Sequence, residues 1–319
     1  MKKGVFTISL DFELYWGVRD HRTLEAYGSN IAKVHEVVPA LLELFTRYGV
    51  HCTWATVGFL FHHNKEELMQ HWPAVLPDYA KKEYDPYGYL EAHELESKYH
   101  FAPQLIEQIR YTPGQEIGTH TYCHFYTLEK DTTPEQFRAD LVAAIEVAHS
   151  QGLAMRSIVF PRNQYGPVHV DICRELGIKV FRGNEDSAVY RPLSREQENS
   201  FRRAIRLADA YLNLTGHHVH PWPAPGPIIN VPASRFLRPW SSTLSFMDPL
   251  RFRRIRNSLR KAAETGTIFH LWWHPHNFGD HTTENLQFLE RILIEFAAER
   301  DQGRMESLTL NEIYDRTQP

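Results

Sequence analysis

Near its start the chain has a short apolar run that ends in two acidic residues, Val5-Phe6-Thr7-Ile8-Ser9-Leu10-Asp11-Phe12-Glu13. We predict that this run is a β-strand, because Asp11 interrupts it before it reaches the length of the apolar part of a signal peptide. Side chains alternate between the two faces of a strand, so residues two positions apart share a face. Asp11 and Glu13 are therefore expected to point the same way where the strand ends.

A pair of histidines follows another strand pattern, in Gly118-Thr119-His120-Thr121-Tyr122-Cys123-His124. Histidines four residues apart lie on one side of a helical turn. Two imidazoles and one carboxylate that leave a coordination position open are typical of a hydrolytic zinc site. The pair alone is weak evidence in a chain with 19 histidines, but the acidic pair at a strand end strengthens it. The sequence therefore predicts a metal site built from both segments.

Strand patterns alternate with helical patterns along most of the chain. Beyond the first strand, we expect strands near residues 50–57, 116–118, 157–160, 178–181, 267–273 and 307–310. Helices are expected near residues 30–48, 133–151, 169–176, 248–265 and 284–299, the first of them capped by Asn30. Repeated strand–helix units predict an α/β fold with a mostly parallel sheet and outer helices, either open or closed into a barrel.

Functional residues of such barrels gather at the carboxyl ends of the strands. Six polar side chains of this chain fall at such ends: Asp11, Glu13, His120, His124, Arg162 and His274. Two stretches, residues 61–110 and 187–246, interrupt the alternation and are predicted to be insertions, which often act as lids or binding loops. No linker divides the chain, so we expect one domain over residues 1–319.

The composition argues against several classes of function. The chain has 319 residues, of which 42% are hydrophobic, and a net charge of −4. These values are typical of a globular protein without the basic surface that binds nucleic acid. No run of about 18 apolar residues is present, so no membrane span is expected. The three cysteines, Cys52, Cys123 and Cys173, are too few and too scattered for a disulfide framework, which favours the cytoplasm.

Four segments occur in the order found in one enzyme family. They are Ser9-Leu10-Asp11-Phe12-Glu13, His120-Thr121-Tyr122-Cys123-His124, Phe160-Pro161-Arg162-Asn163-Gln164-Tyr165-Gly166 and Leu271-Trp272-Trp273-His274-Pro275. From residue 5 to about residue 276, apart from the insertions, the chain resembles the NodB-homology polysaccharide deacetylases, or carbohydrate esterase family 4. The resemblance implies a distorted (β/α)7 barrel that removes N- or O-acetyl groups from sugars with a divalent metal, and Zn²⁺ is the first candidate.

The resemblance also implies which residues bind the metal and which one acts as the general base. Glu13, His120 and His124 would bind the metal, and Asp11 would take a proton from water. The family usually has two adjacent aspartates, whereas Phe12 separates the two acids here. The longer Glu13 side chain can compensate for the offset, but the reverse assignment of Asp11 and Glu13 stays open.

The remaining motif residues have expected roles around the reacting group. Arg162 would orient Asp11 and keep it ionised, although it follows a proline where the family's arginine precedes one. His274 would protonate the departing amine. Asn163, Tyr165 and Trp273 are expected to contact the substrate.

Together these features predict a cytoplasmic, metal-dependent hydrolase that deacylates an N-acetyl or N-formyl amino sugar. Its substrate would be a small molecule or an oligosaccharide, a precursor or glycan of surface polysaccharide biosynthesis. Two alternatives stay open. One is another C–N hydrolase on the same fold, such as an allantoinase-like enzyme that opens a cyclic ureide. The other is a carbohydrate-binding protein that has lost catalysis.

Overall fold

The computed structural model describes residues 2–191, 193, 197 and 199–319. In this part of the chain, nine strands form one sheet in the order β6-β5-β4-β3-β2-β1-β8-β7, and β9 also pairs with β1. The strands are β1 (Gly4–Phe12), β2 (Cys52–Thr56), β3 (Gln115–Thr119), β4 (Ser157–Val159), β5 (Val180–Arg182), β6 (Ile229–Asn230), β7 (Arg235–Phe236), β8 (Ile268–Trp273) and β9 (Met305–Ser307). All of these pairings are parallel, which confirms the predicted α/β fold class.

Residues 229–237 close the barrel between β5 and β8. The first half of this segment hydrogen-bonds along β5, where the Val231 N–H donates to the Phe181 carbonyl at 2.9 Å. The second half hydrogen-bonds along β8, where the Leu237 N–H donates to the Trp272 carbonyl at 2.8 Å. β6 and β7 are thus the two paired parts of one extended segment, which occupies a single position in a distorted (β/α)7 barrel.

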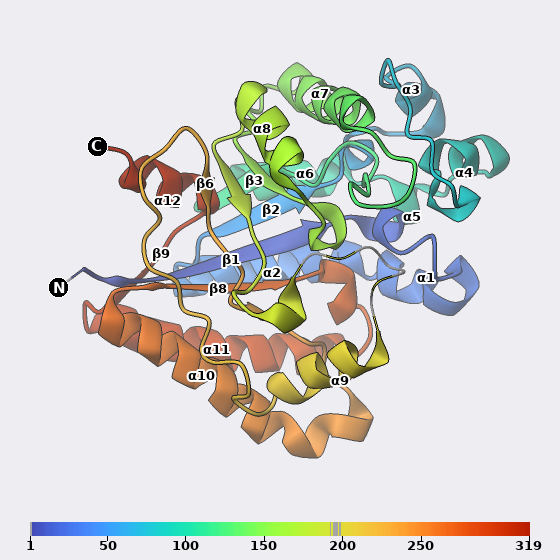
Figure 1. Ribbon diagram of the computed structural model, residues 1–319. Helices are drawn as coiled ribbons and strands as arrows, with labels where there is room; N and C mark the ends of the chain where they lie inside the picture. Colours follow the sequence, from blue (N-terminus) through green and yellow to red (C-terminus); the bar gives the residue numbers. More distant parts are fainter. Residues whose placement is uncertain (1, 192, 194–196, 198) are drawn as a thin grey trace.

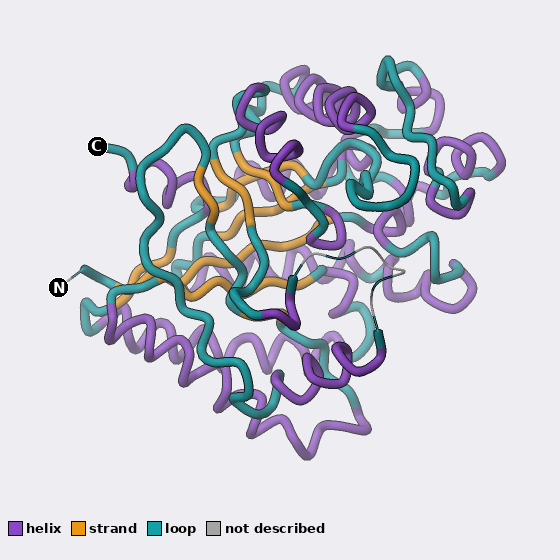
Figure 2. The backbone as a smooth tube through the Cα atoms, in the orientation of Figure 1, coloured by secondary structure: helices purple, strands orange, loops and turns teal. Residues whose placement is uncertain are grey.

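Helices surround the strands on the outside of the barrel (Figure 2). They are α1 (Leu24–Ala32), α2 (Val34–Tyr48), α3 (Lys65–Met69), α4 (Pro86–Ala92), α5 (Ser97–His100), α6 (Pro103–Tyr111), α7 (Pro134–Ser150), α8 (Pro167–Glu175), α9 (Ser200–Asp209), α10 (Asp248–Thr265), α11 (Thr282–Asp301) and α12 (Leu310–Thr317). No helix of the described residues is both long enough and apolar enough to cross a bilayer. Both chain termini lie near the amino ends of the strands (Figure 1).

The two predicted insertions contain much of the irregular structure. Residues 61–110 hold the short helices α3, α4 and α5 and most of α6. Residues 187–246 hold α9 as well as β6 and β7, so part of this stretch belongs to the barrel wall. Residues 192, 194–196 and 198, which fall within the second predicted insertion, lie outside the described residues.

Two predicted boundaries differ from the structure because local caps take precedence. Asn30 lies inside α1, which begins after Thr23, whose side chain accepts a hydrogen bond from the Ala26 N–H at 3.3 Å. The last predicted strand ends at Ser307, because the Thr309 side chain caps the start of α12. In both places a threonine satisfies the free N–H groups of a helix start.

β1 is buried along its whole length and separates two environments. Phe6 packs outward against Phe296 of α11, with ring centroids 5.2 Å apart. Ser9 points into the barrel, where its Oγ lies 2.8 Å from Nε2 of His270. Because side chains alternate along a strand, Asp11 shares the inward face with Ser9. The first strand thus delivers an acid to the inside of the barrel at its carboxyl end.

Candidate metal centre and active site

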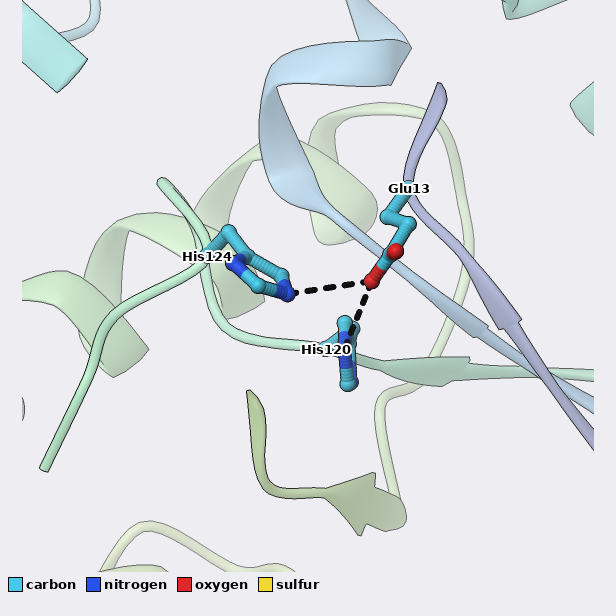
Figure 3. A group of neighbouring side chains, drawn as sticks. All are labelled: Glu13, His120 and His124. Atoms are coloured by element: carbon cyan, nitrogen blue, oxygen red, sulfur yellow. Dashed lines mark ion pairs between the residues drawn. The ribbon is translucent and has the colours of Figure 1, made fainter. Parts of the chain in front are cut away.

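Glu13, His120 and His124 converge just beyond the carboxyl ends of β1 and β3 (Figure 3). Their ligand atoms all lie within 4.8 Å of one another, and all three residues are buried. Oε2 of Glu13 lies 3.3 Å from Nε2 of His120 and 3.0 Å from Nε2 of His124. Nδ1 of His120 donates to the Val159 carbonyl at 2.8 Å, which directs Nε2 at the other two residues.

This donor set fits a divalent cation. His120 Nε2 is buried and makes no hydrogen bond, although it lies beside a carboxylate. Burial would raise the pKa of Glu13, but the charges of His274 and His124 bring it well below its usual value. Burial lowers the pKa of His124 to about 4, so its imidazole is neutral at pH 7. An ionised carboxylate and neutral imidazoles are the forms that bind a metal.

An irregular turn holds the two histidines, rather than the helical turn that their spacing predicts. Thr121 and His124 each have a φ of 64°, in the left-handed region that a β-branched residue such as threonine rarely adopts. Asp140 of α7 fixes this turn by accepting hydrogen bonds from the N–H groups of Tyr122 and Cys123 at 2.7 and 3.1 Å. The strained turn brings the two imidazole rings to a centroid separation of 4.9 Å.

Asp11 is held by Arg182, which ends β5. Nη1 of Arg182 donates to Oδ1 of Asp11 at 2.7 Å, and Nη2 donates to Oδ2 at 2.9 Å. Burial alone would raise the pKa of Asp11, but Arg182, His120 and His274 bring it below its usual value. Asp11 is therefore an ionised carboxylate with a fixed orientation.

The prediction that Arg162 orients Asp11 is wrong. Arg162 instead forms ion pairs with Asp20 and, at 3.2 Å, with Glu129. Its guanidinium lies 3.6 Å from the centre of the Tyr126 ring. The chain turns at Arg162, where φ is 56°, and the side chain extends towards Asp20 while Arg182 occupies the place beside Asp11.

His274 lies just beyond β8, beside both acids. Its Nε2 is 3.7 Å from Oδ2 of Asp11 and 3.6 Å from Oε1 of Glu13. The His274 side chain is 23% exposed, whereas His270 and His276 are buried and burial lowers the pKa of each to about 3. Of these three histidines, His274 is the one placed to exchange a proton with a bound molecule.

Residues 27–181 match the family model for polysaccharide deacetylase. Over this segment the chain is similar to the polysaccharide deacetylase family. The segment contains His120 and His124. Asp11, Glu13 and His274 lie outside it in sequence, and the barrel fold brings them close to the two histidines. No curated protein sequence matches the chain.

Three solved structures share the fold of this chain. A protein described as a polysaccharide deacetylase from Mycobacterium smegmatis is 15% identical, with a TM-score of 0.60 over 99% of this chain and 91% of that one. One from Pseudomonas aeruginosa PAO1 is 13% identical, with a TM-score of 0.54 over 98% and 89%. The Puue allantoinase is 12% identical, with a TM-score of 0.55 over 98% and 88%. At these identities the likeness concerns the fold alone.

The predicted ligands Glu13 and His124 line a cavity of about 330 Å³, which we call the metal cavity. Its walls also include Asp11, Arg162, Asn163, Phe236, Trp272, His274, His276 and Asn277. The cavity therefore brings the predicted base, two predicted ligands and the predicted acid to one open space.

The three residues predicted to contact the substrate lie in different surroundings. Asn163 lines the metal cavity, and its Oδ1 accepts a hydrogen bond from Arg182 at 2.8 Å. Tyr165 packs against Phe160 and Phe181, with ring centroids 5.1 and 5.4 Å away.

The prediction that Trp273 contacts substrate is wrong, because its side chain points outward and is completely buried against Phe278 of the outer layer. Trp272, on the inward face of β8, lines the cavity instead.

Sequence reasoning missed Arg182 as the partner of Asp11. The same pattern that pointed to Arg162, a charged residue at the end of a predicted strand, could also have pointed to Arg182. Arg182 follows the apolar residues Val180 and Phe181 in the same manner. What could not be seen was the contact itself, which joins residues 171 positions apart.

Proposed function

We propose that this chain is a divalent-metal-dependent hydrolase that removes an N-acetyl or N-formyl group from an amino sugar. The observation that carries the proposal is the meeting of Glu13, His120 and His124 with Asp11 and His274 around one cavity. The match of residues 27–181 to the polysaccharide deacetylase family model supports deacylation as the reaction class. We further propose Zn²⁺ as the metal, the cytoplasm as the location, and a sugar of surface polysaccharide biosynthesis as the substrate.

Each residue has a chemical task that its surroundings support. A divalent metal at the Glu13–His120–His124 site would polarise the acyl carbonyl and make water at the site more acidic. Asp11 would accept the proton of the attacking water, since Arg182 keeps its carboxylate ionised and oriented.

His274 would donate a proton to the departing amine nitrogen. Its Nδ1 lies 3.2 Å from Oδ1 of Asn277, which orients the ring so that Nε2 faces the two acids. An acid and a base on either side of the reacting group are what amide hydrolysis needs, because the amine leaves only after protonation.

The test combines metal content with acyl release. The protein is purified without added metal, and metal is measured by elemental analysis in wild type, in His120→Ala/His124→Ala, and in His149→Ala as an exposed control on α7. Acetate and formate release is then measured with a panel of N-acyl amino sugars, with allantoin included. We expect about one metal per chain and acyl release in wild type and the control, and neither in the double variant.

Other outcomes would select an alternative. Turnover of allantoin without turnover of any N-acyl sugar would favour a ureide hydrolase. Metal and sugar binding without turnover would favour a carbohydrate-binding protein. An absence of metal after reconstitution with Zn²⁺, Co²⁺, Ni²⁺, Mn²⁺ and Fe²⁺ would overturn the proposed function.

A further inference from the structure

A second cavity, of about 300 Å³, adjoins the metal cavity. The two share a wall made of Arg162, Asn163, Phe236, Trp272 and His274. Five of the described residues that line the second cavity are arginines and one is acidic; they are Arg162, Arg191, Arg206, Arg235, Arg238 and Glu185. We call this space the arginine cavity. Arg162 is paired with Asp20 and Glu129, but none of the hydrolytic steps described above uses the charges of Arg235 and Arg238.

Arg235, on β7, is only partly neutralised. Its side chain is 4% exposed, and Nη1 lies 3.1 Å from Oδ2 of Asp209. Nε and Nη2 of Arg235 are buried and have no hydrogen-bond partner in the described part of the chain. Asp209 also pairs with Arg254, at 3.4 Å, so one carboxylate serves two guanidinium groups. Buried donors of a cation without acceptors are costly, which indicates a place for an additional anion.

Arg238 adds a second charge that has no ion-pair partner among the described residues, and both burial and the charge of Arg206 lower its pKa. Glu185 lines the same cavity, and burial raises its pKa while the charges of Arg235 and Arg182 lower it. A bound anion would compensate the charge of Arg238.

We propose that the arginine cavity binds a phosphate group carried by the same sugar whose acyl group reaches the metal cavity. This inference rests on the proposed function and narrows its substrate class to acylated sugar phosphates. The shared wall lets one molecule reach both spaces, with Trp272 and Phe236 beside the sugar and Arg235 and Arg238 beside the phosphate.

A phosphate fits this environment better than a carboxylate does. A phosphate monoester carries up to two negative charges and three terminal oxygens, and a diphosphate that links a sugar to its carrier carries two charges and four terminal oxygens, whereas a carboxylate carries one charge and two oxygens. The planar fork of a guanidinium donates two parallel hydrogen bonds to phosphate oxygens. Two under-neutralised arginines, Arg235 and Arg238, therefore match the charge and the number of oxygens of a phosphate.

The first test measures binding of inorganic pyrophosphate by titration calorimetry. The variants are Arg238→Gln in the cavity and Arg253→Gln as an exposed arginine control on α10. His120→Ala/His124→Ala is added to exclude binding through a metal. We expect saturable binding in wild type, in the control and in the histidine variant, and at least a tenfold higher Kd in Arg238→Gln. No binding in wild type, or equal binding in both arginine variants, would overturn the proposal. Thermal melts establish that Arg238→Gln is folded.

The second test compares matched substrates in an acyl-release assay. N-acetylglucosamine is compared with UDP-N-acetylglucosamine and with a short-chain lipid diphosphate carrying the same sugar. A kcat/KM at least tenfold higher for either phosphorylated sugar, lost in Arg238→Gln and kept in Arg253→Gln, supports the proposal. The preferred one of the two identifies the carrier.

Failure of each proposal has its own signature. Pyrophosphate binding that depends on Arg238, without acyl release from any sugar, would support anion binding in the arginine cavity and contradict the proposed deacylase activity. Acyl release that is equal for sugars with and without phosphate, in a protein that does not bind pyrophosphate, would support the deacylase activity and contradict anion binding in the arginine cavity.

Discussion

Arg182 and Asp11 form a two-point ion pair across the inside of the barrel, with both side chains nearly inaccessible to solvent. The arginine ends β5 and the acid lies near the end of β1, so the pair links opposite parts of the wall. The same guanidinium lies 4.2 Å from the centre of the Trp272 ring and donates to Asn163 at 2.8 Å. One residue thus positions the proposed base and two side chains of the cavity.

Removing this arginine should destabilise the protein and stop turnover. We expect Arg182→Gln to lower the free energy of unfolding by about 3–5 kcal/mol, because it leaves the Asp11 charge buried without a partner. Arg156→Gln is the matched control, since it breaks an exposed pair with Asp315 and should cost at most about 1 kcal/mol. Urea denaturation measures both. Equal losses in the two variants would contradict a special role for the Arg182–Asp11 pair.

Substitutions of Glu13 and Asp11 should have different effects, the first on metal binding and the second on turnover. Glu13→Gln should weaken metal binding by at least about 100-fold, because a neutral amide replaces an ionised ligand. Asp11→Asn should keep the metal and lower kcat by about 10²–10⁴-fold, since it removes a general base. Metal content and chelator competition measure the first effect, and acyl release the second. The opposite pattern would establish the reverse assignment of Asp11 and Glu13.

The neighbouring tryptophans of β8 should respond differently. Trp273→Ala should lower the free energy of unfolding by about 3–5 kcal/mol, because it empties a fully buried position. Trp272→Ala should lose less stability and raise KM by about tenfold, which corresponds to a contact energy near 1.4 kcal/mol. Denaturation and steady-state kinetics check the two effects. A Trp272→Ala variant with unchanged KM would show that substrate does not touch this wall.

Stability should fall in acid partly through Asp209. Burial opposes ionisation of this acid, but Arg235, the Thr215 N–H and Arg254 lower its pKa from 3.8 to about 2. A folded-state pKa below the unfolded value gives stability that is present above about pH 4 and is lost as pH falls towards 2. The stability difference between wild type and Asp209→Asn should therefore shrink between pH 4 and pH 2. Glu107→Gln, which changes an exposed acid on α6, should show no such convergence in denaturant titrations at these pH values.

The sequence was most informative where structure is local. Thr133 forms the predicted cap of α7, and Gly49 and Gly266 end helices with φ angles of 62° and 66°. These features depend on a few adjacent residues, so they can be inferred from spacing alone. The convergence of Glu13, His120 and His124 could be anticipated as well, because parallel strands in a barrel share one carboxyl edge.

Contacts between distant segments were beyond the same reasoning. Residues 229–237 contain Pro232 and only short apolar runs, and they become strand-like through pairing with β5 and β8. Trp273 and Trp272 are chemically equivalent in sequence, and the register of β8 decides which one faces the cavity. Arg162 and Arg182 both end strands, and only the three-dimensional arrangement shows which one meets Asp11.

The segment that passes from β5 to β8 carries Arg235 and Phe236, two walls of the arginine cavity. Midway along it, the backbone stops pairing with β5 and begins pairing with β8, so the barrel wall changes strand partner at this point. A ligand that contacts both Asn163 and Arg235 would link the two parts of the wall that meet there. Substrate selectivity can therefore diverge by changing this segment, while the metal-binding residues on β1 and the turn after β3 stay where they are.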